Sequence, residues 1–359
     1  MTNRAKRFFS ILLFEILVIE VEIFIFLFIY EIGQINELYK INYKTDFKKD
    51  EPKEKETPIF KPENLGWEIA IANAPWSKRD AHTALVFNDK IWLLGGVGGK
   101  APDYTQNKSD IWFSDDGESW TLITENASWG PKRAHTSVVF QGKMWILGGV
   151  GNGERYKNDV WHSNNGIDWI EATSSAAWTP RKGHASVVFK DKIWVIGGVD
   201  AKGVVNDVWS SENGKDWILA TSDAAFSPRY DLAAEVFDNK IWLSGGVLPG
   251  EMGMREVWFS EDGINWEKID QEFPWPGRHG HCFISFKNYL WLIGGWSGYG
   301  KGFNDVWFSK DGTSWQKTVN NGPWLGREDL TCVLFENKIW ILGGMITSGD
   351  RTNDVWYSR

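Results

Sequence analysis

The sequence predicts an all-β fold in which six similar modules close into a ring: a six-bladed β-propeller of four-stranded antiparallel blades. Three observations predict it: a repeat period near fifty residues, a double glycine that ends an apolar run in every period, and a tryptophan motif about fifteen residues later. The double glycines are Gly95-Gly96, Gly148-Gly149, Gly197-Gly198, Gly245-Gly246, Gly294-Gly295 and Gly343-Gly344. A period of this length, with several short strands per module, is typical of propellers rather than of helical solenoids.

Each module is expected to contain four strands, named a to d in chain order, because short β-branched and aromatic runs alternate with turn-forming residues. In the second module we expect strand a at 135–140, strand b at 143–147, strand c at 159–162 and strand d from Trp169. The Asn165-Gly166 pair between strands c and d suits a tight hairpin, because both residues tolerate a positive φ. Strand b is apolar at successive positions, as expected where both faces of a sheet are covered.

The two ends of the repeat array predict how the ring closes. The last module stops after its strand c, at 354–359, and a segment like strand d stands alone before the first strand a, at 66–71. We expect this N-terminal outer strand to pair with the last strand c, because closure removes an exposed strand edge.

The repeated features occur together over residues 66–359: the double glycine, the strand-c aromatic, the strand-d tryptophan, and a basic residue with a histidine before strand a. In this pattern the chain resembles the Kelch-repeat family. The resemblance implies a six-bladed propeller. Members of that family serve as protein-binding modules, carbohydrate-binding units and occasional enzymes, so the function has to be argued from the site.

Tryptophan is the outstanding residue, with 24 copies, nearly all of them at repeated positions. We expect the tryptophans of strands b, c and d to fill the space between blades. The aromatic residues of the loop between strands d and a could either pack in the same way or stack on a sugar or a peptide side chain. They are Trp76, Trp129, Trp178, Trp275 and Trp324, with Phe226 in the fourth module.

The N-terminal residues do not belong to the repeat. Residues 1–7 are basic, and residues 8–30 form an apolar stretch long enough to span a bilayer as a helix. Glu15, Glu20 and Glu22 interrupt it, so insertion is marginal on the translocon scale. A buried soluble helix is the alternative, but such a run has no surrounding domain to pack on. We therefore expect a single N-terminal hydrophobic helix that serves as an uncleaved transmembrane anchor or signal-anchor.

The charges around this stretch predict its orientation. Basic residues precede the helix, and the next lysine after it is Lys40. The positive-inside rule then places the N-terminus in the cytoplasm and the propeller on the periplasmic or cell-surface side. Residues 31–65 are rich in charge and resemble a flexible, extended linker.

The two cysteines, Cys282 and Cys332, fall in strand a of neighbouring blades. They lie nine and eight positions before the strand-b tryptophan of their own modules. Because an offset of one residue reverses the face of a strand, we expect no disulfide and interpret both as small core residues.

Composition excludes several functions. The net charge of −8 does not favour nucleic acid or an anionic surface as a partner. The sequence has no phosphate-binding loop, dinucleotide fingerprint or paired-cysteine motif, so we expect no cofactor. His279 and His281 share a strand face but have no carboxylate or cysteine beside them, so we expect no metal site.

The loops differ between the two faces of the ring. The a–b and c–d turns are short and uniform, whereas the b–c and d–a loops, which share the other face, vary. Variable loops on a rigid scaffold are where recognition usually resides, so we place the binding site on the b–c/d–a face.

That face carries a basic residue in every module, thirteen positions before the strand-b tryptophan. These residues are Arg79, Lys132, Arg181, Arg229, Arg278 and Arg327. As a ring around the channel they would favour an anionic ligand, since arginine suits carboxylates. Alternatively, each ties its blade to the next through backbone carbonyls. Together with Trp275, Trp324, Trp296 and Tyr299 they are the predicted ligand-binding residues.

The repeat pattern is broken in two modules, at positions that we expect on one side of the channel mouth. Modules four and six have Asp231 and Asp329 where other modules have alanine or glycine, and Glu328 adjoins the latter. The preferred interpretation is a membrane-tethered module that binds a protein or a glycan. The alternative is a carbohydrate-active enzyme, a hydrolase or a sugar epimerase, that uses these three carboxyls as acid and base. Whether the chain is an enzyme therefore stays open.

Overall fold

The computed structural model describes residues 27, 28, 30, 31, 60–298 and 300–359. The chain divides into two compact units, Met1–Ile59 and Phe60–Arg359. In the first unit, residues 27, 28, 30 and 31 have helical backbone and are exposed. The remainder of the expected anchor, the basic N-terminus and most of the expected linker lie outside the described residues. Among those described, no helix is long and apolar enough to cross a bilayer.

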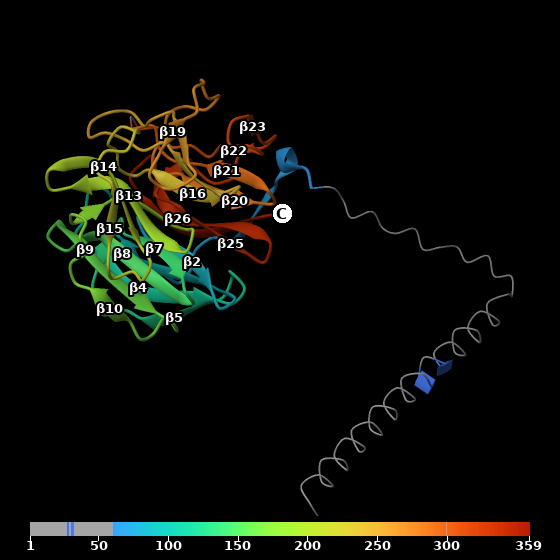
Figure 1. Cartoon of the computed structure of the whole chain (residues 1–359), viewed down its shortest axis with the longest axis horizontal. Coiled ribbons are helices and arrows are strands. Elements are labelled where there is room, and N and C mark those ends of the chain that lie inside the picture. The colour runs from blue at the N-terminus through green and yellow to red at the C-terminus, as the bar shows by residue number, and fades with distance from the viewer. Residues whose placement is uncertain (1–26, 29, 32–59, 299) are drawn as a thin grey trace, which may run out of the picture. The chain divides into compact units, whose positions relative to one another are not determined.

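The second unit is an all-β propeller (Figure 1). Within residues 60–298 and 300–359, hydrogen-bonded pairing defines six four-stranded antiparallel modules. Modules one to three contain β2 (Thr83–Phe87), β3 (Lys90–Val97), β4 (Asn107–Ser114) and β5 (Trp120–Thr124); β7 (Thr136–Phe140), β8 (Lys143–Gly151), β9 (Arg155–Ser163) and β10 (Ile170–Thr173); and β12 (Ala185–Phe189), β13 (Lys192–Asp200), β14 (Gly203–Ser211) and β15 (Ile218–Thr221).

Modules four and five have shorter outer strands than the other modules. Module four contains β16 (Ala233–Phe237), β17 (Lys240–Ser244), β18 (Val257–Ser260) and β19 (Glu267–Lys268); module five contains β20 (Cys282–Phe286), β21 (Tyr289–Ile293), β22 (Val306–Ser309) and β23 (Trp315–Lys317); and module six contains β25 (Thr331–Phe335), β26 (Lys338–Ile346), β27 (Arg351–Ser358) and β1 (Trp67–Ile71).

The sequence predicted one separate sheet for each module, but the six modules do not form six separate sheets. In the described part of the chain the strands group into five sheets: three of four strands, one of five and one of ten. The two-residue strand β11 (Arg181–Lys182) pairs with both β13 and β9, and so joins modules two and three into the ten-stranded sheet. The short strands β6 (Lys132–Arg133) and β24 (Arg327–Glu328) each pair with one strand, β8 and β26 respectively, and join no further modules.

The first strands of the modules surround a common axis. In chain order these strands are β2, β7, β12, β16, β20 and β25; each lies beside the next, and β25 lies beside β2. The ring is therefore closed, and like positions of successive modules gather around one channel.

The predicted N-terminal latch is confirmed. β1 pairs antiparallel with β27, with Trp67 opposite Ser358. The Tyr357 hydroxyl donates a hydrogen bond of 2.6 Å to Glu68, which lies 289 residues earlier in the chain. Figure 1 shows the C-terminus beside the blue segment that begins the propeller. The pairing covers an outer edge that β27 would otherwise expose.

The last residues of the expected linker belong to the propeller. Pro62–Asn64 form a 3-10 turn, and Leu65 is buried. The Phe60 ring lies 6.0 Å from that of Phe286 and 6.4 Å from that of Trp291. An aromatic residue and a leucine among charged neighbours bury apolar area against module five, which anchors the segment.

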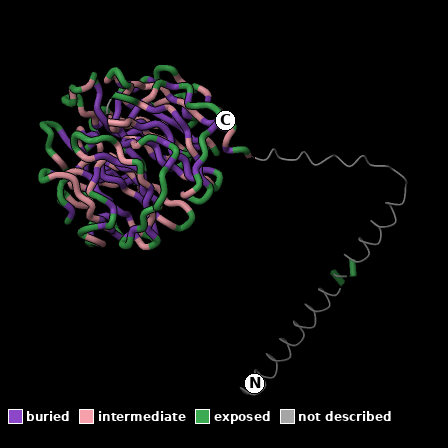
Figure 2. Tube along the Cα trace, turned by 90° about the horizontal axis from the view of Figure 1, so that it is seen from above, coloured by how far each residue is buried: buried purple, intermediate pink, exposed green. Residues whose placement is uncertain are grey.

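Buried apolar side chains form clusters that join neighbouring modules. Figure 2 shows buried residues in purple through the interior of the propeller and exposed residues in green on its outer loops. The strand-b tryptophans illustrate the packing. Trp92 donates its indole N–H to the carbonyl of Phe87 at 3.0 Å, and its ring lies where a methyl group on Gly166 would be. Gly166 belongs to the c–d turn of the next module. The glycine of this turn is thus required by packing between modules as well as by its positive φ of 75°.

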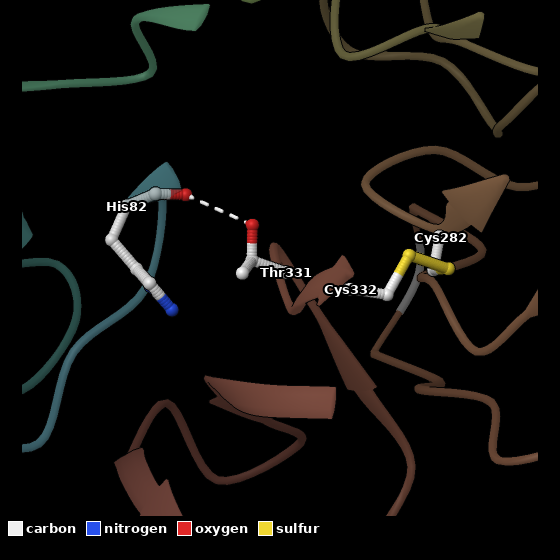
Figure 3. Close-up of a disulfide and its surroundings, with 4 residues drawn as sticks. All are labelled: His82, Cys282, Thr331 and Cys332. Atoms are coloured by element: carbon white, nitrogen blue, oxygen red, sulfur yellow. Dashed lines mark hydrogen bonds between the residues drawn. A yellow bond between two sulfur atoms is a disulfide. The ribbon is translucent and has the colours of Figure 1, made fainter. Parts of the chain in front are cut away.

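The expectation for the cysteines was wrong, because Cys282 and Cys332 form a disulfide between modules five and six (Figure 3). Their Cα atoms lie 6.0 Å apart, within the usual range. Cys282 pairs with Ile293 and Cys332 with Ile341, so the two do point to opposite faces of their own sheets. Neighbouring sheets in a ring meet through opposite faces, however, and the one-residue offset therefore brings the sulfurs together.

Candidate functional site

The repeated basic residues are buried between strands and do not face the channel. Arg79, which is 0% exposed, donates from Nη1 to the carbonyl of Gly95 at 2.8 Å and to Asp110 at 2.7 Å. The same carboxylate accepts the indole N–H of Trp112 at 2.7 Å. The six ion pairs of this kind are Arg79–Asp110, Lys132–Asp159, Arg181–Asp207, Arg229–Glu256, Arg278–Asp305 and Arg327–Asp354.

These pairs hold the chain together at each d–a crossover. Burial alone would raise the pKa of Asp110, but the Arg79 guanidinium outweighs burial and keeps the pKa of that carboxyl below its usual value. Because each cation has a carboxylate partner and is at most 2% exposed, the ring does not hold an anionic ligand. The geometry shows the structural alternative for these residues. The arginines among them form ties to backbone carbonyls, and each residue also has a carboxylate partner.

The predicted aromatic contacts divide in three. Trp275 and Trp324 are 1% and 2% exposed and lie edge to face against Trp315 and Trp67, so they pack between modules and do not reach a ligand. Trp296 is half-buried at the mouth, where its backbone pairs with that of His279. Tyr299 lies outside the described residues.

The residue directly after each buried cation forms a second ring, which we call the mouth ring. Unlike the cations, its members differ in every module: Asp80, Arg133, Lys182, Tyr230, His279 and Glu328. They line a cavity of about 330 Å³ together with Tyr104, Glu154 and Met345, which come from or adjoin b–c loops. The cavity opens on the b–c/d–a face, the face on which we expected a site.

The next residue in each module forms the floor of this cavity. The floor residues are Ala81, Ala134, Gly183, Asp231, Gly280 and Asp329, with φ angles between +46° and +59°. Backbone hydrogen bonds of 2.8 to 3.1 Å run around the axis, from Ala134 to Ala81, Gly183 to Ala134, Asp231 to Gly183, Gly280 to Asp231 and Asp329 to Gly280. The left-handed backbone turns each N–H toward the preceding module, so the floor is rigid.

Glycine in the floor makes room for the two aspartates. A methyl group on Gly183 would overlap Oδ1 of Asp231, and one on Gly280 would lie 2.6 Å from Oδ1 of Asp329. The alternation of glycine and aspartate around modules three to six therefore lets both carboxyls lie along the floor. The structure thus brings Asp231, Asp329 and Glu328 to one cavity, as the sequence suggested.

Two cations at the mouth already have carboxylate partners. Arg133 donates to both oxygens of Glu154 at 2.9 and 2.8 Å, and Arg351 donates to Asp80 at 2.9 Å. Both guanidinium groups lie against the Tyr104 ring, 4.6 and 5.4 Å from its centre. Lys182 lies 5.8 Å from the Tyr156 ring.

Three carboxyl groups of the cavity have raised pKa values. Burial, and then the other carboxyls nearby, raises the pKa of Glu328 and of Asp329, and burial raises that of Asp231 although Lys182 opposes it. Burial lowers the pKa of His279 to about 4, so its ring is neutral at pH 7. Its Nδ1 lies 3.5 Å from Glu328 and has no hydrogen-bond partner.

Below the floor, two of the repeated histidines tie neighbouring modules to one another. The ring of His135 contacts the Thr83 hydroxyl at 3.1 Å, and that of His184 contacts Thr136 at 3.0 Å. Burial lowers the pKa of His82 and of His184 to about 3. These side chains support the channel wall and stay neutral.

A closed ring of antiparallel modules with a polar cavity at one end of its axis defines a β-propeller. Residues 39–246 match the family model described as the KLHDC2/KLHL20/DRC7 Kelch-repeats domain, which covers more than half of the chain. The chain belongs to the Kelch-repeat family.

Solved structures support the fold. The solved structure of YjhT is similar with a TM-score of 0.66 and 19% sequence identity, covering 80% of this chain and 96% of that one. At this identity the likeness concerns the fold alone. No curated protein sequence matches the chain.

The mouth ring is what the sequence interpretation missed, apart from Glu328. The signal was present one position beyond the repeated cation, where all six residues are charged or aromatic and no two are alike. Periodic residues form the buried ion pairs, whereas the residues that line the cavity stand at the position that shows no repeat.

Proposed function

We propose that this chain is a binding module, a six-bladed propeller that takes a polar group of a protein or glycan ligand into the cavity at its channel mouth. The mouth ring carries the proposal, because six different polar or charged side chains converge on about 330 Å³ at the end of an otherwise periodic scaffold. Concave sites with a few convergent polar groups are the usual form of a binding pocket.

The ligand preference follows from the mouth and not from the buried cations. Arg133 and Arg351 are neutralised by Glu154 and Asp80, whereas Asp231, Glu328 and Asp329 face the cavity. An anionic ligand, which the ring of cations suggested, is therefore disfavoured. The same face adds exposed apolar contact area at Met252 and Leu325, which lie in the b–c loop of module four and in the d–a loop that leads into module six.

The proposed location of the propeller is extracytoplasmic, with the N-terminal stretch as membrane tether. The disulfide supports an oxidising compartment, because disulfides form and persist on the outer side of the cytoplasmic membrane and are rare in the cytosol. The basic N-terminus and the apolar stretch at 8–30 support the tether. Protease protection in sealed membrane vesicles tests both statements.

The enzyme alternative is less favoured. Neither the description of the matching family nor the name of the similar structure mentions an activity. The three carboxyls that would act as acid and base are also the groups that a binding site for a polar ligand requires, so their presence does not argue for catalysis.

The test compares two matched tryptophan substitutions on glycan and peptide arrays. Met345→Trp fills the mouth, whereas Leu334→Trp places the same bulk at the other end of the channel, where Leu334 is 38% exposed. We expect ligands of the wild-type protein to bind Met345→Trp at least tenfold more weakly and Leu334→Trp with unchanged affinity. Ligands that bind all three proteins equally would place the site elsewhere and reject the proposal.

A further inference from the structure

We propose that the mouth takes the ammonium group of a lysine side chain from a protein partner, held by Glu328, Asp329 and Asp231. This proposal rests on the proposed function, since it names the chemistry of the ligand at the same cavity.

The first observation is that these carboxyls have no cationic partner. In the part of the chain that the structure describes, none of the three forms an ion pair with a lysine or an arginine, although the six buried cations, Arg133 and Arg351 all have carboxylate partners. Lys182 lines the same cavity and opposes the raised pKa of Asp231 and Asp329. A group of carboxyls so placed gains most from a cation that enters from outside.

The second observation concerns His279, which also lines the cavity. Its side chain is buried, with 9% of the residue exposed, and its Nδ1 has no hydrogen-bond partner. The carboxylate oxygen of Glu328 lies 3.5 Å from it, which is too far for a hydrogen bond. A buried polar atom without a partner is unfavourable unless a ligand or water satisfies it. A neutral imidazole can accept a hydrogen bond from an ammonium group.

The shape of the cavity suits a slender side chain. The two aspartates lie along the glycine floor, Glu328 and His279 belong to the mouth ring above it, and all four line the cavity of about 330 Å³. An ammonium group has three N–H donors and no acceptor, so three or four convergent acceptors match it. The aliphatic stem would pass the rim, where Met345 and Tyr230 line the cavity.

A lysine is favoured over a guanidinium or an amino sugar for reasons of size and donor geometry. The acceptors come from three modules around an axis, which suits a compact point charge better than a planar fork. Met252 and Leu325, exposed apolar residues in loops on the same face, also favour a protein partner over a glycan, because they offer apolar contact area on that face.

Binding should depend on pH. The carboxyls are partly protonated near neutral pH because their pKa values are raised, and an entering cation favours their ionised form. The other titratable groups that face them are Asp80, Glu154, Arg133, Lys182, Tyr104, Tyr230 and His279. Since a lysine side chain stays charged to well above pH 8, affinity should rise between pH 6 and pH 8.

The experiment uses the full-length protein in detergent micelles and three small probes: Nα-acetyl-lysine methylamide, its Nε-acetylated form and the norleucine analogue. Titration calorimetry at pH 6 and pH 8 measures binding. We expect the lysine probe to bind at least tenfold more tightly than either neutral probe, and severalfold more tightly at pH 8 than at pH 6. Equal binding of the three probes, or binding that weakens as the pH rises, would overturn the proposal.

Two carboxamide variants localise the effect. Glu328→Gln and Asp231→Asn should each lower the affinity for the lysine probe at least tenfold, whereas Glu261→Gln, in an exposed turn on the other face, should leave it unchanged. Thermal melting checks that each variant is folded. Because the two substitutions lie in different modules, one variant still tests the proposal if the other does not fold. If array ligands are lost with Met345→Trp but do not depend on lysine, the mouth binds another chemistry and only the present inference fails.

Discussion

Two neighbouring positions in every module have opposite roles. The first is a buried cation that pairs with a carboxylate of strand c, and it is nearly the same residue six times. The second lines the mouth, and it is a different residue each time. Arg181 is 0% exposed and paired with Asp207, while Lys182, next to it, is half-buried at the cavity. In a repeat protein, periodic polar residues therefore indicate what holds the modules together, and the residues beside them that lose the period indicate the site.

The largest expected effect tests the periodic half of this comparison. Arg181→Met should lower the free energy of unfolding by about 3 to 5 kcal/mol, because it leaves the Asp207 carboxylate without its partner near the core. Urea denaturation measures it. The double variant Arg181→Met with Asp207→Leu should recover most of the loss, since both charges are gone. A single variant that costs less than about 1 kcal/mol would mean that the tie is not structural.

The disulfide tests whether an aperiodic feature can also serve the fold. Replacing both Cys282 and Cys332 by alanine should lower the free energy of unfolding by about 2 to 4 kcal/mol, because the crosslink restricts the unfolded chain. The same loss should follow when the wild-type protein is reduced before denaturation, and the reductant should have no effect on the double variant. Equal stability of reduced and oxidised wild type would contradict this expectation.

A carboxyl at a periodic core position should give a smaller, pH-dependent effect. Glu235 pairs with Trp242 where the other modules have leucine, valine or isoleucine, and burial raises its pKa from 4.5 to about 7 despite a hydrogen bond from Ser285. Between these pH values the folded chain holds a proton that the unfolded chain lacks, so this group costs stability as the pH rises from about 4.5 to 7.

Glu235→Gln should therefore stabilise the protein at pH 8 by on the order of 2 kcal/mol and change little at pH 4.5. Denaturation curves at the two pH values, for wild type and variant, measure the difference. A gain of equal size at both pH values would show that ionisation is not its cause.

The smallest effect belongs to the mouth. Lys182→Ala should change the free energy of unfolding by less than about 0.5 kcal/mol, because the lysine forms no ion pair with a carboxylate among the described residues. Denaturation beside Arg181→Met makes the comparison directly, with two substitutions one residue apart. A cost near that of the arginine variant would end the distinction between the two positions.

Much of the fold follows from the sequence because the double glycines, hairpin turns and strand tryptophans each have a local cause that the repeat multiplies. The latch also follows, since a missing strand at one end and a surplus strand at the other need only be matched. The grouping into five sheets does not follow, because it depends on the two-residue strand β11, which is too short to give a pattern.

The site was only partly predictable. Asp231, Asp329 and Glu328 break the repeat and do meet at the mouth. Arg278 and Trp275 occupy repeated positions, and both are buried. A residue type that recurs in every module contributes to the packing of the modules. The prediction for the cysteine pair was wrong for a geometric reason. An offset of one residue reverses the face within one sheet, whereas the disulfide joins two neighbouring sheets.

The latch sets the order in which the molecule can be completed. β1 precedes the other strands of the propeller in the chain and β27 follows them, so β1 has no partner until all the strands between them have been made. Synthesis that stalls before residue 351 would leave two unpaired strand edges at one seam, which invite association with other chains. Both strand edges are therefore covered only when β27, the last strand of the propeller, is present to pair with β1.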